Sequence, residues 1–246
     1  MTTPTYETIV LESRDETRFS AYAARAAKPT GAGIVILPGG RGLLPTYAAL
    51  AERFGSAGID AVAIDPFGRS PEPVLGMRDE EFEFAPHLAK TSPDYTRQDV
   101  AAALEYLRSG TGGAVRTTFT IGFSFGGAAS FLQAVHAEHR LAGVIGCYGW
   151  PSGSTDFPQW PQPVEQVKKY SCPVLAIFGG ADERIPMSEA QQFDAALGKA
   201  SVEHWMVICD GALHGFVDRR AKEFPAQAQV AWQRIVAFVN GLTPAA

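Results

Sequence analysis

The sequence has few cysteines and no long apolar run. Both features narrow the cellular compartments in which the protein is expected. Three cysteines, Cys147, Cys172 and Cys209, are scattered over 246 residues, which is too few for a disulfide scaffold. All three lie in or beside apolar runs, so we expect buried thiols in a reducing compartment. No apolar stretch approaches the roughly 18 residues that a membrane-spanning helix needs. Residues 1–7 lack the basic and apolar regions of a signal peptide, so we expect a cytoplasmic protein without a membrane partner.

Basic runs and metal-ligand patterns are also missing. The net charge is -5 and no cluster of lysine or arginine occurs, which argues against a nucleic-acid partner. The five histidines show no ligand spacing, and we expect His136 and His139 on a solvated helix end. We therefore predict neither a metal nor a cofactor. The sequence leaves the oligomeric state open.

Strands and helices are predicted to alternate along most of the chain. Short apolar runs, typical of parallel strands covered on both faces, occur at residues 34–37, 61–64, 118–121, 141–148, 173–178 and 205–209. Two earlier strands, at 8–13 and 18–24, flank a polar turn and should form an antiparallel edge. Helices are expected at 46–57, 94–108, from 125 to about 139, 188–197 and 224–240. This order predicts an α/β fold with a mostly parallel, twisted sheet of about eight strands and helices on both faces.

The size and composition are those of one large domain. The chain is 46% hydrophobic, which is ample for a single core, so we expect one domain over residues 1–246 without a large cap domain. Two long irregular segments, 67–93 and 149–162, are rich in proline and could line a pocket. The acidic run at 79–83 is expected on a solvated face.

The stretch Gly122-Phe123-Ser124-Phe125-Gly126 lies between an apolar strand and the expected start of a helix. It fits G-x-S-x-G, the nucleophile elbow, in which a serine hydroxyl stands on a turn too tight for side chains at the flanking positions. The alternative is a glycine-rich turn with an incidental serine. An active serine also needs a histidine base and an acid that orients it, each after a later strand.

Two later strand ends carry those residues in the order that the elbow predicts. Asp182 follows the apolar run 173–178, and His214 follows the run 205–209. We therefore expect Ser124 as nucleophile, His214 as general base and Asp182 as the acid that holds the imidazole. Glu183 and Asp210 are rivals for the acid, although Asp210 could simply form a turn.

The oxyanion of a tetrahedral intermediate needs two backbone donors. One should be the N–H of Phe125, directly after the nucleophile. The other should come from the loop after residues 34–37, where Gly40 is the best candidate because Pro38 has no N–H. A nucleotide-binding loop is the rival interpretation, but the third glycine and a Gly-Lys-Ser/Thr sequence are both missing.

Candidate substrate-binding residues are less clearly marked. Arg41 could meet an anionic substrate or lie in solvent. Aromatic residues near the expected site could line an apolar pocket or belong to the core, and these are Phe123, Trp150, Trp160 and Phe216.

Taken together, these motifs resemble the dienelactone hydrolase family of α/β-hydrolases. The resemblance is carried by residues 122–127, 179–186 and 211–216 and covers nearly the whole chain. It implies an α/β-hydrolase fold and a Ser-His-Asp hydrolase. The enzymes for which that family is named use a cysteine nucleophile where this chain has Ser124, and a glutamate after the third strand at a position that corresponds to Gly39 here. Their arginines for the substrate carboxylate have only a weak match here, in Arg219.

The sequence thus predicts a serine hydrolase that cleaves small carboxylic esters or lactones through an acyl-enzyme. Two alternatives stay open. One is a thioesterase or peptidase with the same triad, and the other is a non-catalytic ligand-binding protein of the same fold.

Overall fold

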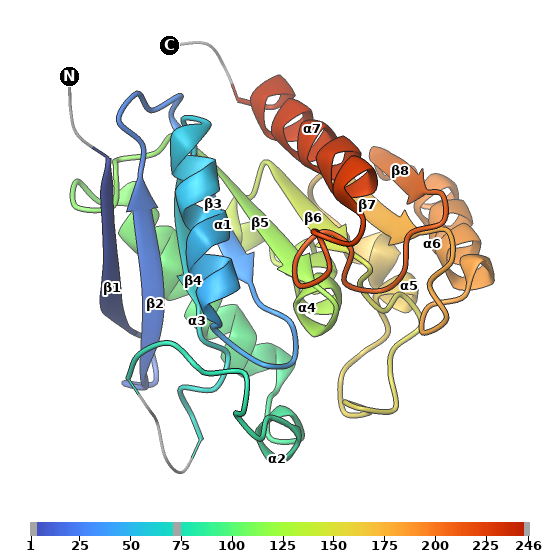
Figure 1. Cartoon of the computed structure of the whole chain (residues 1–246), viewed down its shortest axis with the longest axis horizontal. Helices are drawn as coiled ribbons and strands as arrows, with labels where there is room; N and C mark the ends of the chain where they lie inside the picture. The colour runs from blue at the N-terminus through green and yellow to red at the C-terminus, as the bar shows by residue number, and fades with distance from the viewer. Residues whose placement is uncertain (1–3, 71–74, 244–246) are drawn as a thin grey trace.

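The structure, a computed structural model, describes residues 4–70 and 75–243, which form an eight-stranded sheet with helices on both faces (Figure 1). The strand order is β1-β2-β4-β3-β5-β6-β7-β8. The strands are β1 (Thr5–Glu12), β2 (Arg18–Arg25), β3 (Ala32–Leu37), β4 (Asp60–Ile64), β5 (Thr117–Phe123), β6 (Gly143–Cys147), β7 (Val174–Gly179) and β8 (His204–Cys209). The helices are α1 (Pro45–Ser56), α2 (Ala85–Leu88), α3 (Pro93–Arg108), α4 (Phe125–Gln133), α5 (Pro163–Gln166), α6 (Met187–Lys199) and α7 (Pro225–Gly241).

Strands β3 to β8 are parallel to one another, whereas β1 pairs antiparallel with β2 and β2 pairs antiparallel with β4. Every residue of β3, β4, β6 and β7 is buried, because helices cover both faces of these strands. The predicted mostly parallel sheet with an antiparallel edge is therefore confirmed.

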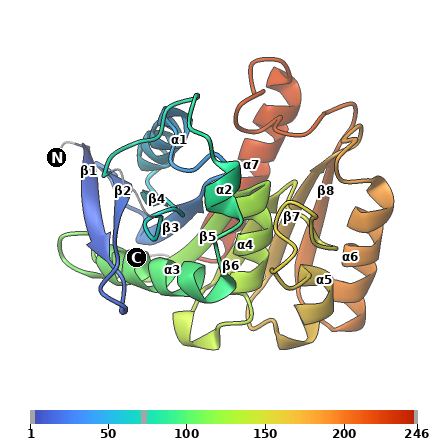
Figure 2. The ribbon, with the colours of Figure 1, turned by 90° about the horizontal axis from the view of Figure 1, so that it is seen from below.

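Two layers of helices enclose the sheet. Helices α1 and α7 lie on one face, and α3, α4 and α6 lie on the other (Figure 2). In α1 the apolar side chains Tyr47, Ala51 and Phe54 recur at helical spacing and are buried against the sheet. Ser92 caps α3 by accepting a hydrogen bond from the N–H of Tyr95.

The helix after Ser124 is shorter than the sequence predicted. It ends at Gln133 rather than near residue 139. Residues Ala137–His139 form a separate 3₁₀ turn, which ends at Arg140, whose backbone is in the left-handed conformation. His139 is buried, with 3% of its surface exposed, so the expectation of a solvated position is wrong for this residue. Its backbone carbonyl accepts a hydrogen bond from Arg108 on α3, which holds the turn against the protein.

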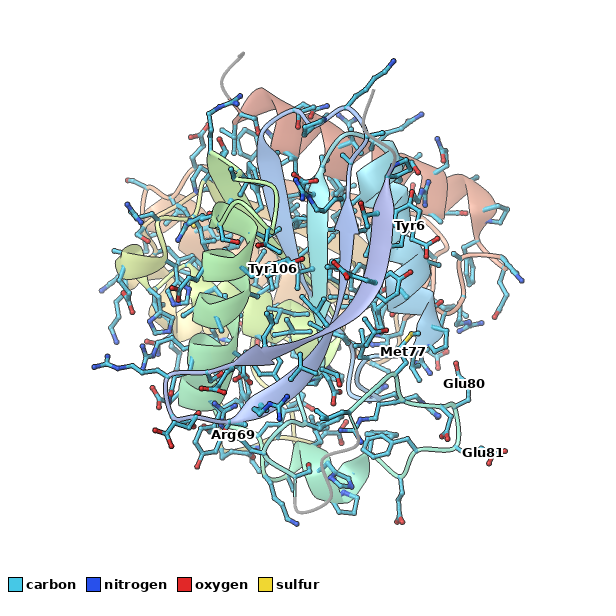
Figure 3. All side chains as sticks on the ribbon, turned by 90° about the vertical axis from the view of Figure 1, so that its left-hand side faces the viewer. Tyr6, Arg69, Met77, Glu80, Glu81 and Tyr106 are labelled. Atoms are coloured by element: carbon cyan, nitrogen blue, oxygen red, sulfur yellow. The ribbon has the colours of Figure 1, made fainter. Side chains whose placement is uncertain are left out.

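The segment 67–93, which was predicted to be irregular, contains the short helix α2. Residues 71–74 of this segment lie outside the described residues. The acidic residues of the 79–83 run are exposed, as expected, and Figure 3 shows Glu80 and Glu81 at the surface. The three cysteines are buried free thiols.

No helix in residues 4–70 and 75–243 combines the length and the apolar character needed to cross a bilayer. The cytoplasmic setting stays a prediction.

The parallel strands all end at the same edge of the sheet. Segments far apart in the chain therefore meet there: the loop after β3, the turn after β5, and the loops after β6, β7 and β8.

Candidate active site

Ser124 lies on a strained turn between β5 and α4. Its backbone has φ 54° and ψ -115°, outside the regions that side-chain-bearing residues normally adopt. A Cβ atom added to Gly122 would lie 1.7 Å from the carbonyl oxygen of Gly126, and one added to Gly126 would lie 2.0 Å from that of Leu37. Both glycines are therefore required by the close approach of backbone atoms, and together they let the serine project from the sheet edge.

The side chains of Ser124, His214 and Asp182 form a continuous hydrogen-bonded row. His214 Nε2 lies 2.9 Å from Ser124 Oγ, and His214 Nδ1 lies 2.8 Å from Asp182 Oδ2. Because a carboxylate only accepts hydrogen bonds, Nδ1 carries the proton and Nε2 presents its lone pair to the serine hydroxyl. The three residues come from the ends of β5, β8 and β7.

The carboxylate of Asp182 is held firmly in place. Its Oδ1 accepts hydrogen bonds from the backbone N–H groups of Arg184 and Ile185, at 2.9 Å and 3.2 Å, and its side chain is fully buried. The rival acids are placed differently, since Glu183 and Asp210 are both exposed. Among the described residues, the carboxylate bonded to His214 is that of Asp182.

Both expected oxyanion donors line the same pocket as Ser124 and His214. The N–H of Phe125 belongs to the first residue of α4, so no carbonyl within the helix can accept its hydrogen bond. In the loop after β3, the N–H of Gly39 donates to the hydroxyl of Tyr47 at 2.8 Å. Gly40 is therefore the next residue whose N–H can serve the pocket.

The pocket at Ser124 is small, with a volume of about 90 Å³. Its apolar wall consists of Leu44, Phe84, Leu88, Phe125, Trp150 and Phe157. Charged residues of both signs lie around it, and these are Arg41, Asp156, Arg184, Asp218 and Arg219. Arg184 pairs with Asp156 at 3.1 Å, and Arg41 donates to the backbone carbonyl of Glu80.

Two of the predicted substrate-binding residues line the pocket and three do not. Arg41 and Trp150 line it, as expected. Phe123 is completely buried and packs against Tyr47 and Tyr148, so its expected place in the pocket wall is wrong. Trp160 and Phe216 do not line the pocket either.

Trp160 lies behind the wall rather than in it. Its ring packs edge-on against Phe125, and its indole N–H donates to Thr91 Oγ1. Phe216 is completely buried against Tyr148. Both residues are therefore part of the core, with 5% and 0% of their surface exposed.

Sequence reasoning missed a group of polar residues beneath the site. Asp218 accepts hydrogen bonds from the hydroxyls of Tyr47 and Tyr148, each at 2.8 Å. Burial and the neighbouring Asp218 raise the pKa of both tyrosines well above its ordinary value, so both remain protonated donors. The only sequence signal was the position of Asp218, four residues after His214.

Within the described residues, no group of three or more histidine, cysteine or acidic side chains is arranged to hold a metal ion. The chemistry that this arrangement can perform is nucleophilic attack by a serine that a histidine deprotonates.

Comparisons with known proteins identify the family of the chain. The model of the dienelactone hydrolase family matches residues 19–242. A curated protein of Escherichia coli, named "Putative carboxymethylenebutenolidase", is 30% identical over 129 residues, which cover 52% of this chain and 47% of that protein. The match thus spans about half the length of the curated relative.

Solved structures show the same fold over nearly the whole chain. The crystal structure of a "Putative Dienelactone Hydrolase" from Klebsiella pneumoniae has a TM-score of 0.81 at 22% identity, covering 97% of this chain and 99% of that one. A dienelactone hydrolase-like promiscuous phosphotriesterase from metagenomic libraries has a TM-score of 0.77 at 18% identity, covering 99% and 100%.

Proposed function

The chain belongs to the dienelactone hydrolase family, a family of hydrolases, and on this basis we propose that it cleaves small carboxylic esters or lactones through an acyl-enzyme. In this proposal Ser124 is the nucleophile, His214 the general base and Asp182 the acid that orients the imidazole. The observation that carries the proposal is the pair of hydrogen bonds from Ser124 Oγ to His214 Nε2 and from His214 Nδ1 to Asp182 Oδ2.

Acylation begins when Ser124 Oγ attacks the ester carbonyl carbon and its proton moves to His214 Nε2. The carbonyl oxygen becomes an oxyanion, which accepts hydrogen bonds from the N–H groups of Phe125 and Gly40. As the C–O bond to the alcohol breaks, His214 gives its proton to the departing alkoxide. Asp182 stabilises the imidazolium that exists between these two transfers.

Deacylation repeats these steps with water. His214 takes a proton from the water as its oxygen attacks the acyl carbon, and the same two N–H groups stabilise the second oxyanion. Collapse of that intermediate releases the carboxylic acid, and the proton on His214 returns to Ser124. With a lactone, the alcohol and acid leave as one hydroxy acid.

The size of the pocket supports a small substrate. A volume of about 90 Å³ accommodates a short acyl group, and bulky apolar side chains, among them Phe84, Leu88 and Phe157, line the pocket and limit its size. We therefore propose substrates with short acyl chains rather than long-chain thioesters or peptides.

The proposal is tested by measuring hydrolysis of p-nitrophenyl acetate together with labelling by an organophosphonate probe. We expect turnover and a single label on Ser124, both lost in Ser124→Ala by on the order of 10⁴-fold or more. Ser56→Ala, which removes an exposed serine hydroxyl on α1, should leave both unchanged. Binding of esters without turnover or labelling would instead favour a non-catalytic ligand-binding protein.

A panel of esters, lactones and thioesters of graded chain length then separates the substrate classes. We expect the highest kcat/KM for acetyl and propionyl esters or small lactones. A preference for long-chain thioesters or for peptide substrates would refute the proposed substrate class while leaving the serine mechanism in place.

A further inference from the structure

One carboxylate that lines the pocket of the proposed active site joins two segments that lie far apart in the sequence. Asp218 Oδ2 accepts a hydrogen bond from Tyr47 on α1, and its Oδ1 accepts one from Tyr148 at the end of β6. Asp218 itself lies on the loop that carries His214. The carboxylate thus connects the start of the fold, its middle and its carboxyl-terminal part at one point.

The Tyr47 side of this connection reaches the proposed oxyanion loop. The Tyr47 hydroxyl donates to Asp218 and accepts from the N–H of Gly39, at 2.8 Å in each case. A Cβ atom at position 39 would lie 3.1 Å from that hydroxyl, so the glycine leaves the room that the hydrogen bond needs. This bond holds the peptide before Gly39. The next peptide, which carries the Gly40 N–H, is held through the Gly39 carbonyl, which accepts a hydrogen bond from the N–H of Gly42 at 3.0 Å. Together the two bonds set the direction of the Gly40 N–H.

The Tyr148 side reaches the imidazole. The Tyr148 ring lies 5.0 Å from the His214 ring, and its backbone N–H donates to the carbonyl of Ile177 at 2.7 Å. Tyr148 also has a left-handed backbone with φ 38°, which a surrounding framework must hold in place. Its hydroxyl bond to Asp218 supplies part of that framework on the loop of His214 itself.

The hydrogen bonds at Asp218 are of the strong kind. A carboxylate only accepts, and each hydroxyl is a neutral donor, so both bonds are charge-assisted and directional. Both donors are buried, since Tyr47 and Tyr148 are 1% and 0% exposed, while Asp218 is half-buried at the wall of the pocket.

We infer that Asp218 is a positioning residue that holds the Gly40 loop and the His214 imidazole in register with each other through Tyr47 and Tyr148. This inference rests on the proposed function for its catalytic consequence. Asp218 acts through the two tyrosines and has no part in the transfer of the proton or the acyl group.

Kinetics of conservative variants test the catalytic consequence. We expect Asp218→Asn, Tyr47→Phe and Tyr148→Phe each to lower kcat by about 10- to 100-fold, the scale set by small misplacements of catalytic groups, with KM almost unchanged. The loss in Asp218→Asn/Tyr47→Phe should be smaller than the product of the two single losses, because both substitutions act on the same Tyr47–Asp218 hydrogen bond. A raised KM at unchanged kcat would overturn the inference, since it would make Asp218 a substrate-binding residue.

The chain offers a matched control. The Tyr22 hydroxyl donates to Glu52 at 2.6 Å, a second tyrosine–carboxylate pair, which joins β2 and α1 and does not line the pocket. Tyr22→Phe should therefore leave kcat and KM unchanged. An equal loss of kcat in Tyr22→Phe would mean that the effect is one of general stability and would overturn the inference.

Hydrogen exchange tests the positioning without any need for turnover. In Asp218→Asn the backbone amides of segments 39–43 and 214–218 should exchange several-fold faster than in the wild type. In Tyr22→Phe the amides of the same two segments should exchange at the wild-type rate. Unchanged exchange in both segments would overturn the inference even if wild-type turnover is normal. Faster exchange in an inactive wild type would support the positioning and refute the proposed function. If Asp218→Asn does not fold, Tyr47→Phe removes one hydroxyl only and gives the same two readouts.

Discussion

Arg78 and Asp65 form a buried ion pair directly beneath the loop that carries Gly40. Their side chains are 3% and 1% exposed, and Arg78 Nη2 lies 2.7 Å from Asp65 Oδ2. The loop is bonded to both residues, because the backbone N–H of Leu43 donates to Asp65 and its carbonyl accepts from the N–H of Arg78. This pair therefore fastens the segment after β4 to the loop after β3.

Breaking this pair on one side should destabilise the fold strongly. Arg78→Met leaves the carboxylate of Asp65 buried without a counter-ion, which costs about 3–5 kcal/mol in comparable cases. Urea denaturation should show this loss in the free energy of unfolding. The double variant Asp65→Leu/Arg78→Met, which removes both charges, should recover a large part of it. A loss below about 1 kcal/mol in the single variant would show that water reaches the carboxylate.

Asp182 and Asp210 should differ sharply in their effect on catalysis. Asp182→Asn leaves an amide facing His214 Nδ1 and favours the wrong tautomer, so kcat should fall on the order of 10⁴-fold with the fold intact. Asp210→Asn changes an exposed residue and should leave kcat within about twofold. Steady-state kinetics on p-nitrophenyl acetate measure both. A large loss in Asp210→Asn alone would make Asp210 the acid.

Glycine at position 122 should be required for the stability of the fold, unlike glycine at position 110. Gly122→Ala places a Cβ atom 1.7 Å from the carbonyl oxygen of Gly126, so β5 and α4 must separate. We expect a loss of about 3 kcal/mol or more in unfolding free energy, as for other overpacked sites. Gly110→Ala, where a Cβ meets nothing within 4 Å, is the control and should unfold like the wild type.

Phe84 should limit the length of the acyl chain. It lines the pocket, and a Cβ atom at Gly40 would lie 3.6 Å from its ring, so it borders the site where the carbonyl oxygen is expected. In Phe84→Ala the ratio of kcat/KM for butyrate over acetate esters should rise about 10-fold or more, the scale of one or two methylene groups in a pocket. An unchanged ratio would place the acyl chain elsewhere.

The fold and the three central side chains could be predicted from the sequence because both depend on local patterns. Apolar runs typical of strands alternate with segments in which apolar residues recur at helical spacing. A parallel sheet then brings the carboxyl ends of its strands to one edge. Ser124, Asp182 and His214 each follow such a run, and their meeting at that edge is a consequence of the topology.

The residues that sequence reasoning missed depend on long-range packing. Tyr47 has the spacing of a core residue in α1, and its hydroxyl meets Asp218, 171 positions later in the chain. No local pattern reports such a contact. Phe123 was wrongly expected in the pocket because its neighbours in sequence, Ser124 and Phe125, do line it, whereas the side chain of a strand residue alternates to the opposite face.

Acid should destabilise the protein through His139. Burial, helped by the positive charge of neighbouring groups, lowers the pKa of His139 from 6.5 to about 4, and neither ring nitrogen has a hydrogen-bond partner among the described residues. At pH values between these two pKa values, His139 binds a proton in the unfolded state but not in the folded state. The folded state is therefore favoured fully above about pH 6.5 and loses up to about 3 kcal/mol as the pH falls to 4. His139→Leu removes the titratable group. Urea denaturation at pH 7, 5.5 and 4 should therefore show that, as the pH falls to 4, the wild type loses up to about 3 kcal/mol more unfolding free energy than the variant. A difference between the two proteins that does not vary with pH would mean that the pKa of the imidazole is the same in the folded and unfolded states.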